Sequence, residues 1–152
     1  ACSILAASAA AMEKPYRVSF AGDSFDGNSW QTGIRIELAE GWKTYWRMPG
    51  EAGIPPDFAW VSSEPVEIAV SYPVPGRYAD ASGETVGYET EVVFPVTVTA
   101  TAASAVRLDL VLFFAVCKDI CIPARAEVST ELGSMARDPE GTARVERAKA
   151  AI

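Results

Sequence analysis

Residues 106–116 read VRLDLVLFFAV, the most regular strand pattern in the chain. Apolar side chains occupy every second position from Val106 through Leu110 to Val116, which is typical of a strand with one buried face. The other face turns apolar between Val111 and Ala115, so we expect this end of the strand to be buried on both sides.

The same period of two recurs along the chain. It is clear in Trp30–Leu38, Val66–Tyr72 and Val92–Val98, and weaker strands fit at 16–21, 42–47, 57–61 and 125–132. Turns rich in Gly, Pro, Asn and Asp separate these stretches. About eight short strands, with no helical period before residue 138, indicate an all-β fold, an immunoglobulin-like antiparallel β-sandwich.

The end of the chain predicts a short C-terminal helix. Asp138 is suited to the N-cap, and Pro139 fits the first helical position. Val145, Ala148 and Ile152 then fall on one helical face. We interpret 13–152 as a single domain.

Residues 1–12, ACSILAASAAAM, resemble the back part of a secretory signal peptide. A short apolar piece precedes small-x-small patterns that suit cleavage, and twelve residues fall short of the about twenty that span a membrane. A short helix, or a lipoprotein role for Cys2, are the alternatives. Removal near Ala11 would leave two cysteines, an even number that suits an oxidising compartment.

Composition excludes several classes of function. The 152 residues carry a formal net charge of −7 and include no histidine. Ser-His-Asp and Cys-His catalysis, imidazole zinc sites and histidine pH switches are therefore excluded. An acidic chain without basic clusters is poorly suited to nucleic acids. Because Met48 is a single soft ligand near the cysteines and histidine is absent, we expect no metal site.

The segment Cys117-Lys-Asp-Ile-Cys121 holds the candidate reactive residues, two closely spaced cysteines. In an extended strand, residues four apart are separated by about 13 Å, so the segment must curl if the sulfurs are to bond. Such a short loop stabilises the fold by only about 2 kcal/mol. Spacing alone leaves open a structural staple, a pair for thiol exchange and a metal site.

Three segments together resemble one protein family. They are GWKTYWRMPGEAGIPPDFAW (41–60), YPVPGRYADASGETVGYETEVVFPVTVTA (72–100) and VCKDICIPARAEV (116–128). The resemblance is to the N-terminal periplasmic domain of DsbD and ScsB-type thiol:disulfide interchange proteins, and it extends over most of residues 16–132. The copper-tolerance branch, ScsB, is the most similar because its cysteines are similarly spaced, whereas better-studied DsbD domains have a longer gap.

This resemblance implies an immunoglobulin-like domain of an inner-membrane protein-disulfide reductase, located in the periplasm and needing no cofactor of its own. Such a domain takes electrons from a thioredoxin-like domain of the same membrane protein. It passes them to a periplasmic disulfide isomerase or another thioredoxin-fold protein. By the same resemblance, Cys117 and Cys121 form a reversible disulfide, Cys121 makes the mixed disulfides with partners, and Cys117 resolves them.

The family also has a cap loop whose aromatic tip covers the disulfide, and it should fall at about 77–87. Here Ala81 and its neighbours replace the aromatic tip, so we expect the disulfide to be open to small reductants unless Tyr78 or Tyr88 covers it. Asp80 is a further neighbouring candidate, and Tyr45 lies in a segment that can border the site. The rival hypothesis is a non-catalytic immunoglobulin-like binding module with a structural disulfide.

Overall fold

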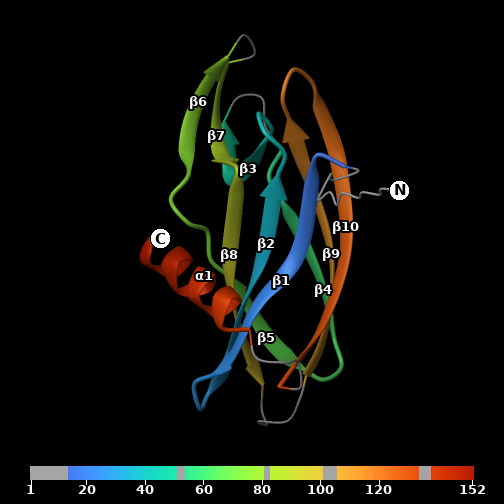
Figure 1. Cartoon of the computed structure of the whole chain (residues 1–152). Coiled ribbons are helices and arrows are strands. Elements are labelled where there is room, and N and C mark those ends of the chain that lie inside the picture. The colour runs from blue at the N-terminus through green and yellow to red at the C-terminus, as the bar shows by residue number, and fades with distance from the viewer. Residues whose placement is uncertain (1–13, 51–53, 81–82, 101–105, 134–137) are drawn as a thin grey trace, which may run out of the picture.

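The structure, a computed structural model, describes residues 14–50, 54–80, 83–100, 106–133 and 138–152. Figure 1 shows strands in two layers with one helix on the outside. In chain order the elements are β1 (Tyr16–Phe25), β2 (Ser29–Leu38), β3 (Lys43–Gly50), β4 (Asp57–Ser62), β5 (Val66–Val70), β6 (Gly76–Asp80), β7 (Gly83–Glu89), β8 (Glu91–Ala100), β9 (Val106–Cys117), β10 (Cys121–Leu132) and α1 (Pro139–Ala150). The predicted signal remnant, 1–12, lies outside the described residues.

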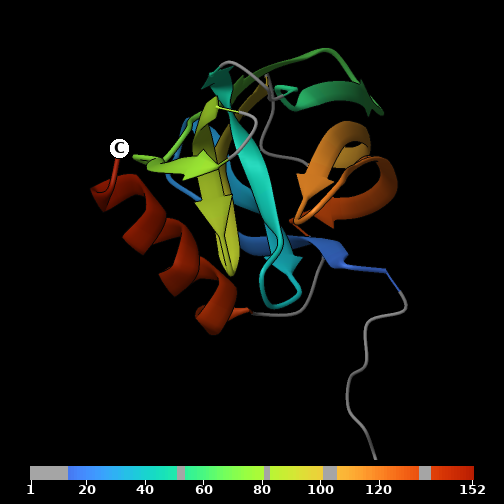
Figure 2. The ribbon, with the colours of Figure 1, turned by 90° about the horizontal axis from the view of Figure 1, so that it is seen from above.

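The strands form two antiparallel sheets. The four-stranded sheet has the order β1-β2-β8-β5, and the six-stranded sheet has the order β10-β9-β3-β7-β6, with β4 paired to β9. Seen from above, α1 lies on one side of the sandwich and the β9–β10 hairpin on the other (Figure 2). The predicted immunoglobulin-like antiparallel sandwich with a short C-terminal helix is confirmed.

The core follows the alternation in the sequence. The inward side chains of β2, β8 and β9 are almost all fully buried, and the largest of them are Ile34, Ile36, Phe94, Leu108, Leu110 and Leu112.

The outward face of β9 is less buried than we predicted. Ala115 is 1% exposed, but Phe113 is 45% exposed. Burial on both sides was therefore a wrong prediction at Phe113, whose ring lies against the Arg125 guanidinium, 5.7 Å from the ring centroid, in a cation–π contact.

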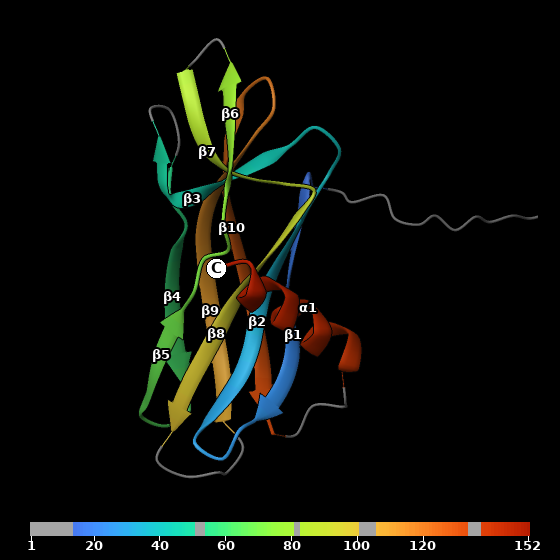
Figure 3. The ribbon, with the colours of Figure 1, turned by 90° about the vertical axis from the view of Figure 1, so that its left-hand side faces the viewer.

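Helix α1 packs on the outer face of the four-stranded sheet, in front of β1 and β2 in Figure 3. Asp138 caps it: its carboxylate accepts hydrogen bonds of 3.0 Å from the backbone N–H of both Gly141 and Gly22, so one side chain joins the helix to β1. Val145 is buried against Gly33. The predicted cap is confirmed, but Ile152 lies beyond the helix end and is 59% exposed, so its place on the packed face was wrong.

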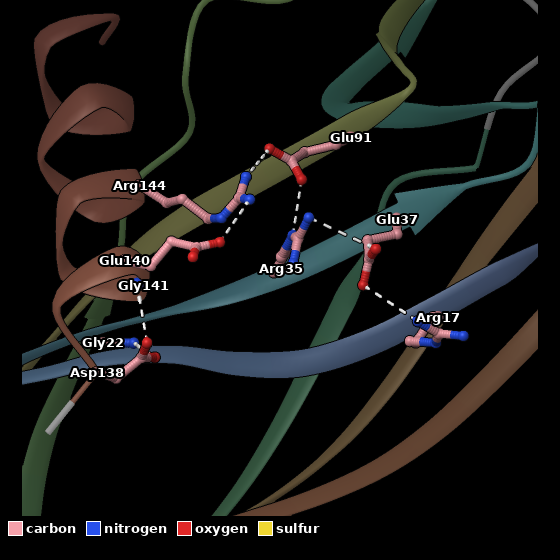
Figure 4. Close-up of polar contacts among 9 residues, drawn as sticks. All are labelled: Arg17, Gly22, Arg35, Glu37, Glu91, Asp138, Glu140, Gly141 and Arg144. Atoms are coloured by element: carbon pink, nitrogen blue, oxygen red, sulfur yellow. Dashed lines mark hydrogen bonds and ion pairs between the residues drawn. The ribbon is translucent and has the colours of Figure 1, made fainter. Parts of the chain in front are cut away.

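A row of alternating charges supports this helix (Figure 4). Glu91 on β8 accepts from Arg35 at 2.6 Å and from Arg144 of α1 at 2.8 Å. From Arg35 the row continues over the sheet through Glu37 and Arg17, and from Arg144 it continues along the helix to Glu140.

Within the described part of the chain, no helix is both long and apolar enough to cross a membrane.

The region expected to be a cap loop, 77–87, is largely a β-hairpin. Gly76–Asp80 pairs with Gly83–Glu89, and β7 pairs in turn with β3. The pairing of β7 with β3 joins segments that are distant in sequence, so local patterns do not predict it. Figures 1 and 3 place this hairpin at the same end of the sandwich as the turn between β9 and β10.

Candidate functional site

Cys117 and Cys121 form a disulfide at the end of the β9–β10 hairpin. Cys117 ends β9, Cys121 begins β10, and the two residues lie directly opposite each other in the ladder. Their sulfurs are bonded at 2.05 Å, and their Cα atoms are 4.1 Å apart. The backbone N–H of Lys118 donates to the Ile120 carbonyl at 3.0 Å, which closes the turn. The curl that the spacing required is therefore a tight hairpin turn.

The two cysteines differ in exposure. Cys121 is exposed and Cys117 is half-buried. Beside them, Ile120 at the tip of the turn is 66% exposed. A disulfide can be exchanged only if an incoming thiolate reaches one sulfur along the S–S axis. Cys121 is the more accessible of the two residues for such an attack.

Tyr45 lies against both sulfurs. Its side chain is 4% exposed, and its hydroxyl donates to Sγ of Cys117 at 2.6 Å and lies 3.3 Å from Sγ of Cys121. The preceding residue anchors the strand, because the Thr44 hydroxyl donates to the Ala115 carbonyl at 2.8 Å in a buried position. The structure thus brings Tyr45, a candidate from the sequence, to the cysteine pair.

Lys43 brings a positive charge to the same end of β3. It lies directly opposite Cys117 on one side and Glu89 on the other. Its Nζ is 5.1 Å from the centroid of the Tyr78 ring. Burial, and to a smaller extent the charge of Glu89, raise the pKa of the Tyr78 phenol above its usual value. Sequence patterns did not indicate Lys43, because only the strand register places it beside a cysteine.

The other candidates fall in different places. Tyr78 lies on β6 with its hydroxyl folded over Gly76, where a Cβ atom would stand 2.6 Å from it. Tyr88 packs in the core: its ring meets Phe94, and its hydroxyl donates to the Pro73 carbonyl at 2.9 Å. Tyr88 is paired with Thr44, so it points to the face opposite to that of Tyr45. It does not cover the disulfide.

The two remaining candidates belong to the tip of the hairpin. Asp80 ends β6, and Ala81 lies outside the described residues. Among the residues that the structure does describe, no group of three or more Cys, Asp or Glu side chains could hold a metal ion. Within the described part of the chain, the two sulfurs and the Tyr45 hydroxyl that touches them are the groups on which the chemistry can be argued.

A disulfide across the end of one hairpin of an immunoglobulin-like sandwich is a group that can take part in thiol:disulfide exchange, and similarity to known proteins defines the family. The profile of "Thiol:disulfide interchange protein DsbD, N-terminal" matches residues 9–132. The chain belongs to this family and is a thiol:disulfide interchange domain of the DsbD N-terminal type. No curated protein matches the chain.

Two solved structures share the fold. The N-terminal periplasmic domain of ScsB from Proteus mirabilis superposes with a TM-score of 0.68 at 24% identity, over 90% of this chain and 60% of that one. The N-terminal domain of Neisseria meningitidis DsbD in its reduced form gives a TM-score of 0.51 at 17% identity, over 83% of this chain and 92% of that one. The chain thus spans less than two thirds of the ScsB chain.

Proposed function

We propose that this domain relays electrons by thiol:disulfide exchange in the periplasm, as one module of a membrane-bound protein-disulfide reductase. Its donor is a thioredoxin-like domain of the same membrane protein. Its acceptor is a periplasmic disulfide isomerase or another thioredoxin-fold protein. The observation that carries this proposal is the Cys117–Cys121 disulfide, formed between directly paired residues of which Cys121 is exposed, in a chain of the interchange family.

The domain first becomes reduced. A donor thiolate attacks Sγ of Cys121, the S–S bond to Cys117 breaks, and its electron pair stays on Cys117 as a thiolate. The second donor thiolate then attacks the donor sulfur of the mixed disulfide and releases Cys121. The donor leaves as a disulfide, and the domain leaves as a dithiol that has gained two electrons and two protons.

The reduced domain then passes the electrons on. The Cys121 thiolate attacks the disulfide of the acceptor and forms a mixed disulfide. Cys117 attacks Sγ of Cys121, which restores the Cys117–Cys121 disulfide and releases the acceptor as a dithiol. The exposure of Cys121 and the half-burial of Cys117 support these roles, because the partner-facing sulfur must be reached by another protein.

A purely structural role has less support. The disulfide closes a loop between residues four apart in sequence, which stabilises a fold by about 2 kcal/mol. The sandwich already has a continuous buried core between its sheets. A staple in this position would add little to it.

Trapping of mixed disulfides tests the proposal. A purified, oxidised thioredoxin-fold disulfide isomerase is mixed with Cys117→Ala or with Cys121→Ala, each in a Cys2→Ser background, and the products are separated without reductant. Cys117→Ala should accumulate a mixed disulfide through Cys121, because the resolving thiol is missing. Cys121→Ala should accumulate none. The reverse pattern would contradict the assigned roles, and no adduct with either variant would contradict the relay.

A further inference from the structure

The Tyr45 hydroxyl is in direct contact with both reacting sulfurs, at 2.6 Å from Sγ of Cys117 and 3.3 Å from Sγ of Cys121. A disulfide sulfur is a weak hydrogen-bond acceptor, whereas a thiolate is charged and accepts far more strongly. The contact therefore strengthens when the S–S bond breaks and negative charge collects on Cys117. Interactions that strengthen as charge develops are the ones that accelerate a reaction.

We propose that Tyr45 is a catalytic residue that stabilises the Cys117 thiolate, as the leaving group during reduction and as the resolving nucleophile afterwards. This inference rests on the proposed exchange function and adds a direction to it. With the hydroxyl donor closer to Cys117, attack at Cys121 expels the better-stabilised thiolate. Attack at Cys117 would instead expel Cys121, whose sulfur lies farther from the hydroxyl. Tyr45 and the exposure of Cys121 thus both favour attack at the Cys121 sulfur.

The fold holds this donor in place before any reaction. Tyr45 is 4% exposed, so little water competes for its hydroxyl. Thr44 ties β3 to the Ala115 carbonyl next to the cysteine hairpin. On the other side, β7 approaches so closely that only a glycine fits at position 87. A donor fixed in this way needs little reorganisation when the thiolate forms.

Charged side chains around Cys117 are mixed in sign and do not replace this contact. Lys43 lies directly opposite Cys117, and Glu89 lies directly opposite Lys43. Lys118 and Asp119 follow Cys117 in the turn, and the Lys118 side chain extends over Gly41. Lysines favour a neighbouring thiolate and carboxylates oppose it, so these groups partly offset one another. The Tyr45 hydroxyl acts in one direction only.

The test isolates Cys117 as the only thiol. The chain contains three cysteines, so Cys2→Ser with Cys121→Ser leaves Cys117 alone. The rate of alkylation by iodoacetamide is measured across pH with and without Tyr45→Phe, and circular dichroism checks the fold. The midpoint of the profile reports thiolate formation, whereas its plateau reports access. Tyr45→Phe should move the midpoint upward and lower the rate at neutral pH about tenfold, since one hydrogen bond to a charged group is lost.

Tyr88→Phe is the matched control. It also removes a buried tyrosine hydroxyl from the same pair of strands, but that hydroxyl binds the Pro73 carbonyl on the opposite face. It should lower stability and leave the midpoint unchanged. An unchanged midpoint in Tyr45→Phe, or an equal shift in Tyr88→Phe, would overturn the role of Tyr45. This measurement needs no partner protein. The role of Tyr45 can therefore be confirmed even if the trapping of partners fails, and the trapping can succeed even if Tyr45 has no effect on Cys117.

Discussion

Gly87 lies directly opposite Tyr45 in the β3–β7 ladder, at a point where the two strands come unusually close. A Cβ atom on Gly87 would overlap the Thr44 carbonyl oxygen and stand 2.9 Å from Cα of Tyr45. Backbone atoms cannot yield as the end of a flexible side chain can. Gly87 therefore sets the position of the strand that carries Tyr45 to the disulfide.

Replacing this glycine should disturb both stability and the site. We expect Gly87→Ala to lower the free energy of unfolding by about 1–3 kcal/mol, because the added methyl forces β7 away from β3. Urea unfolding measures this change. Glu84→Ala, at an exposed position of the same strand, is the control and should stay within about 0.5 kcal/mol of the parent. A Gly87→Ala protein as stable as its parent would contradict the close approach.

The disulfide should contribute little to stability. The double variant Cys117→Ala/Cys121→Ala should remain folded and lose about 2 kcal/mol, the value for closing so short a loop. Circular dichroism and urea unfolding, compared with the oxidised parent, check this. Collapse of the fold in the double variant, or in the parent after reduction, would instead identify the disulfide as a structural staple.

The cap of α1 should make stability depend on pH in a defined direction. Hydrogen bonds from the backbone of Gly22 and then Gly141 lower the pKa of Asp138 below its usual value. A carboxyl group with a lowered pKa in the folded state adds stability above its unfolded pKa, and this stability is lost as pH falls through the folded pKa.

Asp138→Ala should therefore cost about 1 kcal/mol at neutral pH, the value of a lost N-cap. The cost should shrink as the pH falls from about 4, the ordinary pKa of an Asp in the unfolded chain, through the lower pKa of the folded Asp138 carboxyl. Urea unfolding of both proteins across this range provides the measurement. A difference that is constant with pH would show that the carboxylate charge contributes nothing to the cap.

Local patterns predicted much of this fold because they follow the period of single elements. The alternation in residues 30–38 placed Ile34 and Ile36 in the core, and the Asp138-Pro139 pair placed the helix start. Patterns failed where burial depends on what covers a face. Phe113 looked buried because its neighbours are apolar, but its side chain is 45% exposed.

The sequence predicted the local part of the site, the cysteine pair, but not the contacts made by distant strands. Both cysteines lie within five adjacent residues, so their pairing needed only a local curl. The contacts of Tyr45 and Lys43 with this pair depend on a register between β3 and β9, strands separated by more than fifty residues. Tyr88 shows the opposite error. It seemed able to cover the disulfide, but strand alternation turns it into the core.

If the Cys117–Cys121 disulfide is a reversible relay, its redox potential must show this. The domain is equilibrated with glutathione buffers of known potential, and its free thiols are counted by alkylation and mass spectrometry. A relay must be poised among thioredoxin-fold partners, so we expect a midpoint between about −120 and −270 mV. A midpoint below about −300 mV, typical of structural disulfides that resist glutathione, would show that the disulfide is not a relay.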